Sequence, residues 1–230
     1  MTLGRDGSEI EIAVEDAALP AYLARPAAGH GPGVLVFHEA FGLVEHVRDV
    51  CDRLARAGFV ALAPDLFRGR SADSAEQAAE LVAGLEAQRV MDDLAGATQA
   101  LINEHAVDGP RIGAVGFCMG GHLALLAATV SPRVAAVVDF YGVAPGLPLD
   151  LSKLEAAVLA VFAENDEFVS SEAVEELRAG LAAAGKQASI LVHPGVGHAF
   201  MNDSRPDCHD AAAAAEGWDR MLALLRAELS

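Results

Sequence analysis

The chain has few of the residues that mark secreted, metal-binding or membrane proteins. Its three cysteines, Cys51, Cys118 and Cys208, are odd in number and form no CxxC pair. This pattern argues against a disulfide framework, and a reducing cytoplasm is the simplest setting for the protein. No apolar run reaches the roughly 18 residues that a membrane-spanning helix needs. Residues 1–12 are charged and lack the apolar core of a signal peptide, so we expect no secretion signal.

Basic residues are also scarce. The chain has 16 Lys and Arg against 33 Asp and Glu, which gives a formal net charge of −17. Such a charge repels nucleic acids and anionic membranes, so we expect neither as a partner. It does not exclude a small anionic substrate, because arginines close to a site decide that locally.

Cofactor motifs are missing as well. No HExxH motif is present, and the histidines, including His209 beside Asp210, lack the spacing of metal ligands. The glycines at Gly116 and Gly120 come with neither a phosphate-binding lysine nor the spacing of a dinucleotide loop. We therefore expect neither a metal nor an organic cofactor.

What the chain has in abundance is short apolar runs between helical patterns. Hydrophobic residues make up 53% of it and aromatic residues only 5%. Strands are expected at 33–38, 59–63, 112–115, 134–138, 158–162 and 187–193, with one or two edge strands within 8–25. Helices are expected over 47–58, 74–105 (one or two helices, broken near Gly84), 123–129, onward from Ser170 or Ser171, and 211–229.

The expected strands are near-continuous apolar segments, which is typical of a parallel sheet covered by helices on both faces. A chain of 230 residues can bury about 70–75% of its unfolded surface in one core. The pattern predicts a single α/β domain over residues 1–230, with a mostly parallel sheet of about seven or eight strands. Whether that domain is a monomer or a homodimer stays open.

The most informative stretch of the chain is Gly116-Phe117-Cys118-Met119-Gly120-Gly121. It lies between an apolar run and an Ala- and Leu-rich segment, which is the strand–turn–helix context of a nucleophile elbow, with Cys118 in place of the usual serine. The flanking glycines let strand and helix approach where a Cβ would clash. Cys118 would then stand above the sheet edge at a helix N-terminus, which favours a thiolate. The alternative is a buried structural cysteine in a tight turn.

Two further loops carry the partners that such a nucleophile needs. Active residues of parallel sheets gather beyond the carboxyl ends of the strands, where residues 163–167 and 194–200 follow two of the expected strands. His198 would deprotonate Cys118, and Asp166 would orient the imidazole and stabilise its charged form. The order nucleophile, acid, histidine along the chain is that of the α/β-hydrolases.

Each of these partners has a competitor. His193 stands at the end of its strand and could pair with backbone alone, whereas the Gly-x-Gly turn before His198 frees its ring to reach across the loops. Glu164 and Glu167 compete with Asp166, and their ordinary place is a solvated acidic loop. We favour His198 and Asp166, the latter because the acid of such triads is usually an aspartate.

An oxyanion hole needs two backbone N–H donors. One would come from Met119, directly after the nucleophile, and the other from Ala40, in the loop that follows the strand at 33–38. Glu39, in the same loop, would place a carboxylate at the mouth of the site. It would oppose thiolate formation by its charge and could accept a hydrogen bond from a neutral thiol. The alternative is a solvent-facing charge on the loop.

Six segments spread over the whole chain form a specific pattern: His38-Glu39-Ala40-Phe41-Gly42, Ala63-Pro64-Asp65-Leu66-Phe67, Gly116-Phe117-Cys118-Met119-Gly120-Gly121, Phe140-Tyr141-Gly142, Asn165-Asp166-Glu167-Phe168-Val169 and Gly197-His198-Ala199-Phe200. This pattern resembles the dienelactone hydrolase family of α/β-hydrolases. The resemblance implies a triad of Cys118, His198 and Asp166. It also implies that Glu39 pairs with the resting thiol until substrate displaces it and releases a thiolate.

The reaction implied by the resemblance is carboxylic ester hydrolysis of a cyclic enol-lactone. The family opens the dienelactone 4-carboxymethylenebut-2-en-4-olide to maleylacetate in chloroaromatic catabolism. Two of the shared segments supply Phe41 and Tyr141, which the resemblance assigns to substrate contact.

The chain departs from the family where the substrate carboxylate binds. The family pattern holds that carboxylate with two arginines, one of them four residues after the catalytic histidine, and this position is Asn202 here. Asn202 and the nearest arginine, Arg205, are the candidates for substrate binding, although an exposed arginine is ordinarily a surface charge. The second arginine would be one of three that follow the strand at 59–63, namely Arg68, Arg70 and Arg89.

Three other functions are compatible with the same residues. The protein could be a cysteine-dependent carboxylesterase of a different substrate. It could be a non-catalytic binding protein or thiol sensor, if Glu39 keeps the thiol protonated. A thiol oxidoreductase is disfavoured, because no resolving cysteine stands near Cys118 in the sequence.

Overall fold

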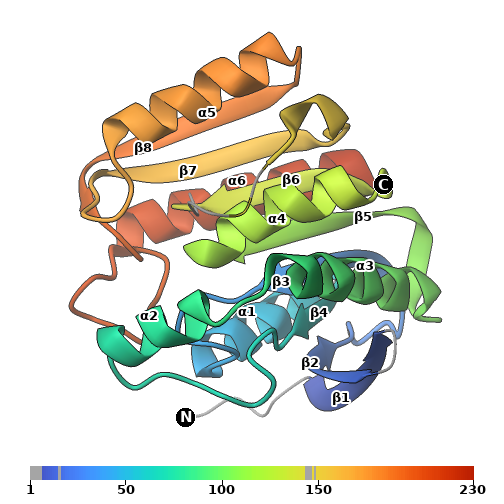
Figure 1. Cartoon of the computed structure of the whole chain (residues 1–230). Coiled ribbons are helices and arrows are strands. Elements are labelled where there is room, and N and C mark those ends of the chain that lie inside the picture. Colours follow the sequence, from blue (N-terminus) through green and yellow to red (C-terminus); the bar gives the residue numbers. More distant parts are fainter. Residues whose placement is uncertain (1–6, 15–16, 143–146, 148) are drawn as a thin grey trace.

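An eight-stranded sheet runs through the middle of the protein, in the order β1-β2-β4-β3-β5-β6-β7-β8 (Figure 1). The structure is a computed structural model, and it describes residues 7–14, 17–142, 147 and 149–230, so residues 1–6 of the segment tested above for a signal lie outside it. The strands are β1 (Gly7–Val14), β2 (Ala17–Ala24), β3 (Gly31–Phe37), β4 (Val60–Pro64), β5 (Val107–Phe117), β6 (Val134–Phe140), β7 (Ala157–Asn165) and β8 (Ala188–Gly197).

Most of this sheet is parallel. The strands from β4 to β8 in the sheet order pair in parallel, and β1 and β2 add an antiparallel pair at one edge. The helices are α1 (Glu45–Arg56), α2 (Ala75–Ala83), α3 (Ala87–Asn103), α4 (Met119–Val130), α5 (Ser171–Ala183) and α6 (Ala211–Leu229), with a short 3-10 helix at Leu151–Lys153. The predicted α/β class and the mostly parallel sheet of seven or eight strands are confirmed.

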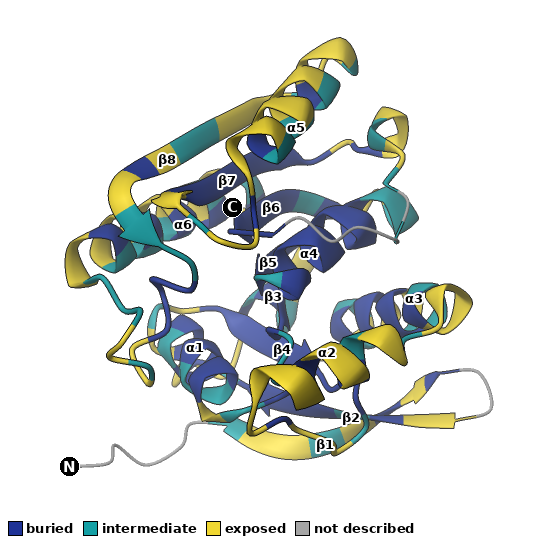
Figure 2. Cartoon of the chain, turned by 60° about the vertical axis from the view of Figure 1, so that its left-hand side comes forward, coloured by how far each residue is buried: buried dark blue, intermediate teal, exposed yellow. Residues whose placement is uncertain are grey.

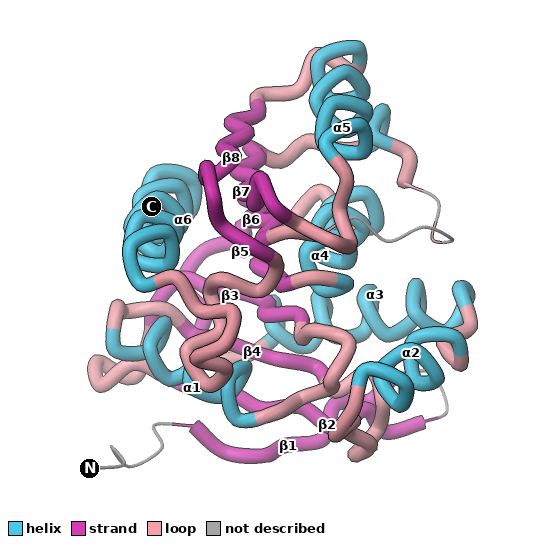
Figure 3. The backbone as a smooth tube through the Cα atoms, turned by 90° about the vertical axis from the view of Figure 1, so that its left-hand side faces the viewer, coloured by secondary structure: helices cyan, strands magenta, loops and turns pink. Residues whose placement is uncertain are grey.

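Helices cover both faces of the sheet, with α1 and α6 on one side and α2, α3, α4 and α5 on the other (Figure 3). Each face of the sheet carries its own hydrophobic core, and the strands contribute to both because successive side chains point to opposite faces. In β3, Leu35 and Phe37 join the apolar cluster under α3 and α4, whereas Val34 and Val36 join the cluster under α1 and α6. The central strands and α4 are accordingly the most deeply buried elements (Figure 2).

Local sequence signals placed several boundaries correctly. Gly84 separates α2 from α3, as predicted, and of the two candidate caps of α5 the structure selects Ser170, whose Oγ accepts from the Ala173 N–H at 3.3 Å. The ends of β7 and β8 were predicted too short. Pairing continues to Asn165 opposite Gly197, and the Glu164 carboxylate accepts the Gly195 N–H at 2.7 Å across the two strands. Residues expected in loops therefore belong to the sheet.

The sheet and α4 meet at the predicted elbow. Phe37 in β3 lies level with Gly116 in β5, so both strands end at the same edge. A Cβ on Gly116 would overlap the Gly120 carbonyl, and a Cβ on Gly120 would overlap the Phe37 carbonyl. The first turn of α4 thus packs on the backbone of both strands, which only glycine permits. No helix in the described part of the chain is long and apolar enough to cross a membrane.

We expect Gly116→Ala to destabilise the fold by about 3 kcal/mol or more, because the added methyl group meets backbone that cannot move aside. Gly84→Ala is the matched control. Its φ is −81° and the nearest atom to the new Cβ would be 3.4 Å away, so a change of less than about 1 kcal/mol is expected. Urea unfolding followed by circular dichroism measures both, and equal stability of the two variants would refute the packing argument.

Candidate active site

Cys118 occupies the turn between β5 and α4. Its backbone has φ 54° and ψ −124°, a left-handed conformation that is costly for a residue other than glycine. The Cys118 N–H donates to the Phe140 carbonyl at 2.9 Å, and its own carbonyl accepts from the Gly121 N–H at 2.9 Å. The turn is therefore fixed from both sides, and it places Cys118 at the N-terminus of α4, the positive end of the helix dipole.

His198 and Asp166 form a close pair beyond the ends of β8 and β7. His198 Nδ1 lies 2.9 and 2.8 Å from the two carboxylate oxygens of Asp166. The Asp166 side chain is fully buried, and its Oδ1 also accepts the N–H groups of Phe168 at 2.8 Å and Val169 at 3.0 Å. Since Nδ1 faces the carboxylate, it carries the proton, which leaves Nε2 available for proton transfer.

The environment of His198 favours its charged form. Burial acts to lower the pKa of the imidazole, but the hydrogen bonds to Asp166 and Cys118 and the charges of both groups outweigh it and raise the pKa to about 9. The contribution of Cys118 shows that the thiol is within interaction distance of the ring. An imidazolium beside a thiolate is the activated state of a nucleophilic cysteine.

The competing residues have other partners. Glu164 is held by the Gly195 N–H, and Glu167 is exposed on the loop. The His193 ring is buried and packs edge-on against Phe200, with ring centroids 5.3 Å apart. Among the alternatives that the sequence left open, the structure therefore joins Asp166 to His198.

The two expected oxyanion donors come from neighbouring segments. Met119 is the first residue of α4, so its N–H has no partner within the helix. Ala40 follows β3, whose last carbonyl lies against Gly120. No hydrogen bond to a described residue uses the Ala40 N–H. The two loops that carry these donors are therefore packed together at the elbow.

Glu39 is buried rather than solvent-facing, with only 3% of its surface exposed. Its Oε2 accepts from Asn202 Nδ2 at 2.9 Å, and its Oε1 accepts from the Tyr141 hydroxyl at 3.3 Å. Within the described part of the chain, no hydrogen bond joins Glu39 to Cys118. Tyr141 and Asn202 hold the carboxylate in this structure, and the pairing of Glu39 with the resting thiol, implied by the resemblance, stays a prediction.

Tyr141 separates Glu39 from the histidine. Its ring lies 4.9 Å from the His198 ring and 5.2 Å from that of Phe200, between centroids, and its φ is +47°. Burial, followed by the charges of Glu39 and Cys118, raises the pKa of the Tyr141 hydroxyl well above its usual value, so it remains a neutral donor. Tyr141 therefore lies beside both His198 and Glu39, and its contact with substrate stays a prediction.

Asn202 does not face an open site. It is 2% exposed, and its Oδ1 accepts from the N–H of Ser204 at 3.2 Å and from its Oγ at 2.6 Å, while Nδ2 binds Glu39. Both lone pairs of Oδ1 and one of the two Nδ2 N–H groups are therefore used inside the protein, and the expected contact of Asn202 with substrate stays a prediction. Arg205 is half-exposed and lies 5.5 Å from the Phe41 ring centroid, with Asp207 at 3.4 Å. It places a cation beside the Ala40 loop.

The three remaining candidate arginines line one cavity of about 210 Å³ next to residues 65–70. Arg68 is unavailable to a ligand there, because it binds both oxygens of Asp93, at 2.7 and 2.8 Å. Arg70 donates to the Phe67 carbonyl at 3.3 Å through Nε. Arg89 also lines the cavity, and a contact of any of the three arginines with a substrate carboxylate stays a prediction.

Sequence reasoning did not single out Phe168. This side chain is 70% exposed although it is large and apolar, and its ring lies edge-on to His198 at 4.9 Å. It stands two residues after Asp166, so its place in the same loop was the available signal. An apolar ring in this place shields one side of the His198 imidazole from water.

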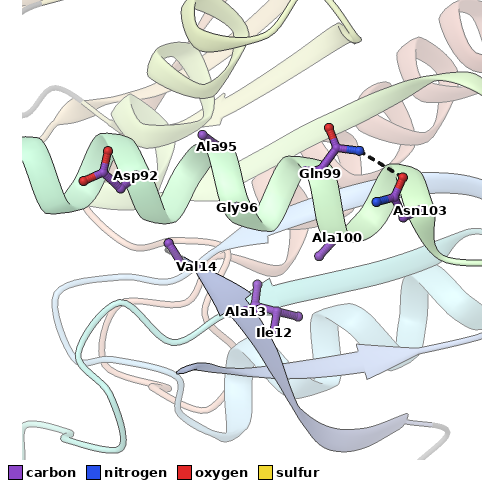
Figure 4. Close-up of a pocket in the computed structure, with 9 residues that line it drawn as sticks. All are labelled: Ile12, Ala13, Val14, Asp92, Ala95, Gly96, Gln99, Ala100 and Asn103. Carbon is purple, nitrogen blue, oxygen red and sulfur yellow. Dashed lines mark hydrogen bonds between the residues drawn. The ribbon is translucent and has the colours of Figure 1, made fainter. Parts of the chain in front are cut away.

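A larger groove lies elsewhere, between β1 and α3, with a volume of about 600 Å³ (Figure 4). Gly96 allows this contact, because a Cβ there would meet the Val14 side chain at 2.5 Å. None of the candidate site residues lines this groove. No cluster of three or more His, Cys, Asp or Glu side chains suited to a metal occurs among the described residues.

We expect Asp166→Asn to lower the pKa of His198 from about 9, because the hydrogen bond and the charge that raise it are lost. A raised pKa stabilises the fold below the unfolded value of about 6.5, and this contribution disappears as the pH rises through 9. In Asp166→Asn this contribution to stability should be lost at lower pH than in wild type. NMR titration of the imidazole measures the shift, with Glu164→Gln as the control. An unchanged His198 midpoint in Asp166→Asn would contradict the assignment.

Comparison with known proteins identifies the family. The sequence profile of the dienelactone hydrolase family matches residues 19–229. A protein of Salmonella typhi, provisionally named a carboxymethylenebutenolidase, is 38% identical over 220 residues, which cover 89% of this chain and 81% of that protein.

Solved structures agree with this. A provisionally assigned dienelactone hydrolase from Klebsiella pneumoniae superposes with a TM-score of 0.86 at 34% identity, covering 96% of this chain and 98% of that one. A dienelactone hydrolase-like promiscuous phosphotriesterase from metagenomic libraries gives 0.89 at 25% identity, covering 97% and 98%. The chain therefore belongs to the dienelactone hydrolase family, a family of carboxylic ester hydrolases built on the α/β-hydrolase fold.

Proposed function

We propose that the protein hydrolyses a small lactone or activated carboxylic ester by covalent catalysis at Cys118. The observation that carries this proposal is the strained elbow that presents Cys118 close to His198, which is itself paired with buried Asp166. A merely structural cysteine needs neither the strain nor the charged imidazole beside it. Strain of this kind persists only where the surrounding structure enforces it.

The reaction follows from these groups. The Cys118 thiolate attacks the carbonyl carbon, and the N–H groups of Met119 and Ala40 stabilise the resulting oxyanion. The carbon–oxygen bond of the ester breaks, and the leaving oxygen takes the proton of the His198 imidazolium. His198 then removes a proton from water, the hydroxide attacks the thioester, and the carboxylate product leaves as the thiolate re-forms. Opening a lactone keeps both fragments in one molecule.

For the substrate we propose the dienelactone 4-carboxymethylenebut-2-en-4-olide, which would yield maleylacetate as in the catabolism of chlorinated aromatics. The support is the family and the name of the Salmonella relative. Phe41 and Arg205 would contact the substrate at the mouth of the site, because they are adjacent there. The guanidinium of Arg205 could bind the carboxylate in place of the buried Asn202.

A carboxylesterase acting on a different substrate is the second candidate. The observation that favours it is Asn202, whose amide is occupied by Glu39 and Ser204 and supplies no charge to a substrate carboxylate. A non-catalytic binding protein or thiol sensor is the third. The imidazolium beside Cys118 speaks against it, because a thiol kept protonated needs no such partner.

We further propose a cytoplasmic protein that acts on a small molecule, as a monomer or homodimer, without nucleic acid or membrane as partner. The three cysteines are free thiols, which suits a reducing compartment. The net charge of −17 disfavours polyanionic partners.

Cys118→Ala should reduce turnover of both dienelactone isomers and of p-nitrophenyl acetate by about 10⁶-fold, the loss typical of a removed nucleophile. Steady-state hydrolysis followed by absorbance measures it, with Cys208→Ala as the control that removes another thiol. If wild type cleaves only the simple ester, and does so only with Cys118 present, the proposed triad is retained and the natural substrate is not a dienelactone. Turnover by Cys118→Ala close to that of wild type would refute covalent catalysis.

For Glu39 we propose gating of the thiol by charge, since Tyr141 and Asn202 hold its carboxylate. Glu39→Gln removes that charge and should move the pH profile of Cys118 alkylation by iodoacetamide to lower pH, because a nearby anion opposes thiolate formation. Glu164→Gln, which changes a carboxylate bound to backbone instead, should leave the profile in place. An identical profile in Glu39→Gln and wild type would show that Glu39 has no influence on the thiol.

A further inference from the structure

His38 is a fully buried histidine at the end of β3, and both of its ring nitrogens are engaged with backbone. Nε2 accepts a hydrogen bond from the Leu66 N–H at 3.2 Å. Because an amide can only donate, Nε2 carries no proton, and the neutral ring must carry its proton on Nδ1. Nδ1 lies 2.7 Å from the Glu39 carbonyl oxygen and therefore donates to it.

The surroundings keep this tautomer fixed. Burial lowers the pKa of His38, against the opposing effects of the Glu39 backbone and of the Asp65 and Glu39 charges, so the ring stays neutral. The Asp65 carboxylate accepts the N–H groups of Phe67 at 3.1 Å and Gly69 at 2.5 Å, which orders the turn that presents Leu66. The Phe67 ring lies 4.9 Å from the imidazole, between centroids.

The acceptor of this hydrogen bond belongs to the same peptide unit as the Ala40 N–H. Peptide groups are planar, and the described chain contains no cis peptide, so the Glu39 carbonyl and the Ala40 N–H point in opposite directions. A second donor, the Gly42 N–H at 3.1 Å, holds the same carbonyl. Whatever fixes the carbonyl also fixes the direction of the N–H.

We propose that His38 is the positioning residue of the oxyanion hole, which aims the Ala40 N–H at the reacting carbonyl by binding the opposite end of its peptide. This inference rests on the proposed function, because an oxyanion arises only if Cys118 attacks an acyl carbon. His38 touches neither substrate nor thiol in this role. Its contribution appears in the transition state, where an oxyanion donor acts, rather than in substrate binding.

Two variants, one with a hydrogen-bond donor and one without, separate the hydrogen bond from packing. His38→Asn retains an N–H donor at about the place of Nδ1, whereas His38→Leu offers none. We expect kcat for p-nitrophenyl acetate to fall at least about 10-fold in His38→Leu, up to the roughly 10²–10³-fold loss of an entire donor. In His38→Asn kcat should recover most of this loss, with similar KM in both.

Alkylation of Cys118 by iodoacetamide is the second readout, because this reaction forms no oxyanion. Both variants should react at the wild-type rate, which shows that elbow and thiol are intact. Equal kcat in the two variants, or alkylation that falls in parallel with kcat, would overturn the proposal. If neither leucine nor asparagine is tolerated, His38→Phe, which keeps the ring against Phe67, gives the donor-free case. Hydrolysis that survives in Cys118→Ala would instead refute the proposed function.

Discussion

The close contact between the first turn of α4 and the ends of β3 and β5 is the constraint on which the site depends. Gly116 and Gly120 bring the helix onto the backbone of both strands, and the turn between them holds Cys118 at a positive φ. The same contact brings the loop with Ala40 to the helix N-terminus. One packing arrangement of backbone on backbone therefore positions Cys118 and the two proposed oxyanion donors.

Charge in the site is arranged around this frame. Asp166 and Cys118 raise the pKa of His198 to about 9, which favours the imidazolium. Glu39 introduces a further carboxylate nearby, which Tyr141 and Asn202 hold by hydrogen bonds. Tyr141 is a neutral donor, and its ring stands against His198. The site thus holds the buried Glu39 carboxylate by two neutral donors, and no ion pair joins Glu39 to an arginine among the described residues.

Asn202 explains how that is possible. Where the family pattern has an arginine for the substrate carboxylate, this chain has an amide that binds Glu39 and is itself held by Ser204. An amide donor fixes the carboxylate without cancelling its charge. For the anionic substrate proposed above, Arg205 beside Phe41 would supply a cation at the surface in place of a buried ion pair.

The sequence by itself determined the strands, the elbow and the chain order of Cys118, Asp166 and His198, because apolar runs, flanking glycines and loops after strands are local patterns. The lengths predicted for β7 and β8 were too short, because the last residues of these strands pair through backbone hydrogen bonds that no side-chain pattern indicates. Only the tertiary structure shows that Asp166 rather than Glu164 pairs with His198 and that Glu39 is buried. It also shows that the Asn202 amide binds Glu39 and that His38 binds the Glu39–Ala40 peptide. These choices depend on distances between segments far apart in the chain, such as Glu39 and Asn202, and a linear pattern carries no information on such distances.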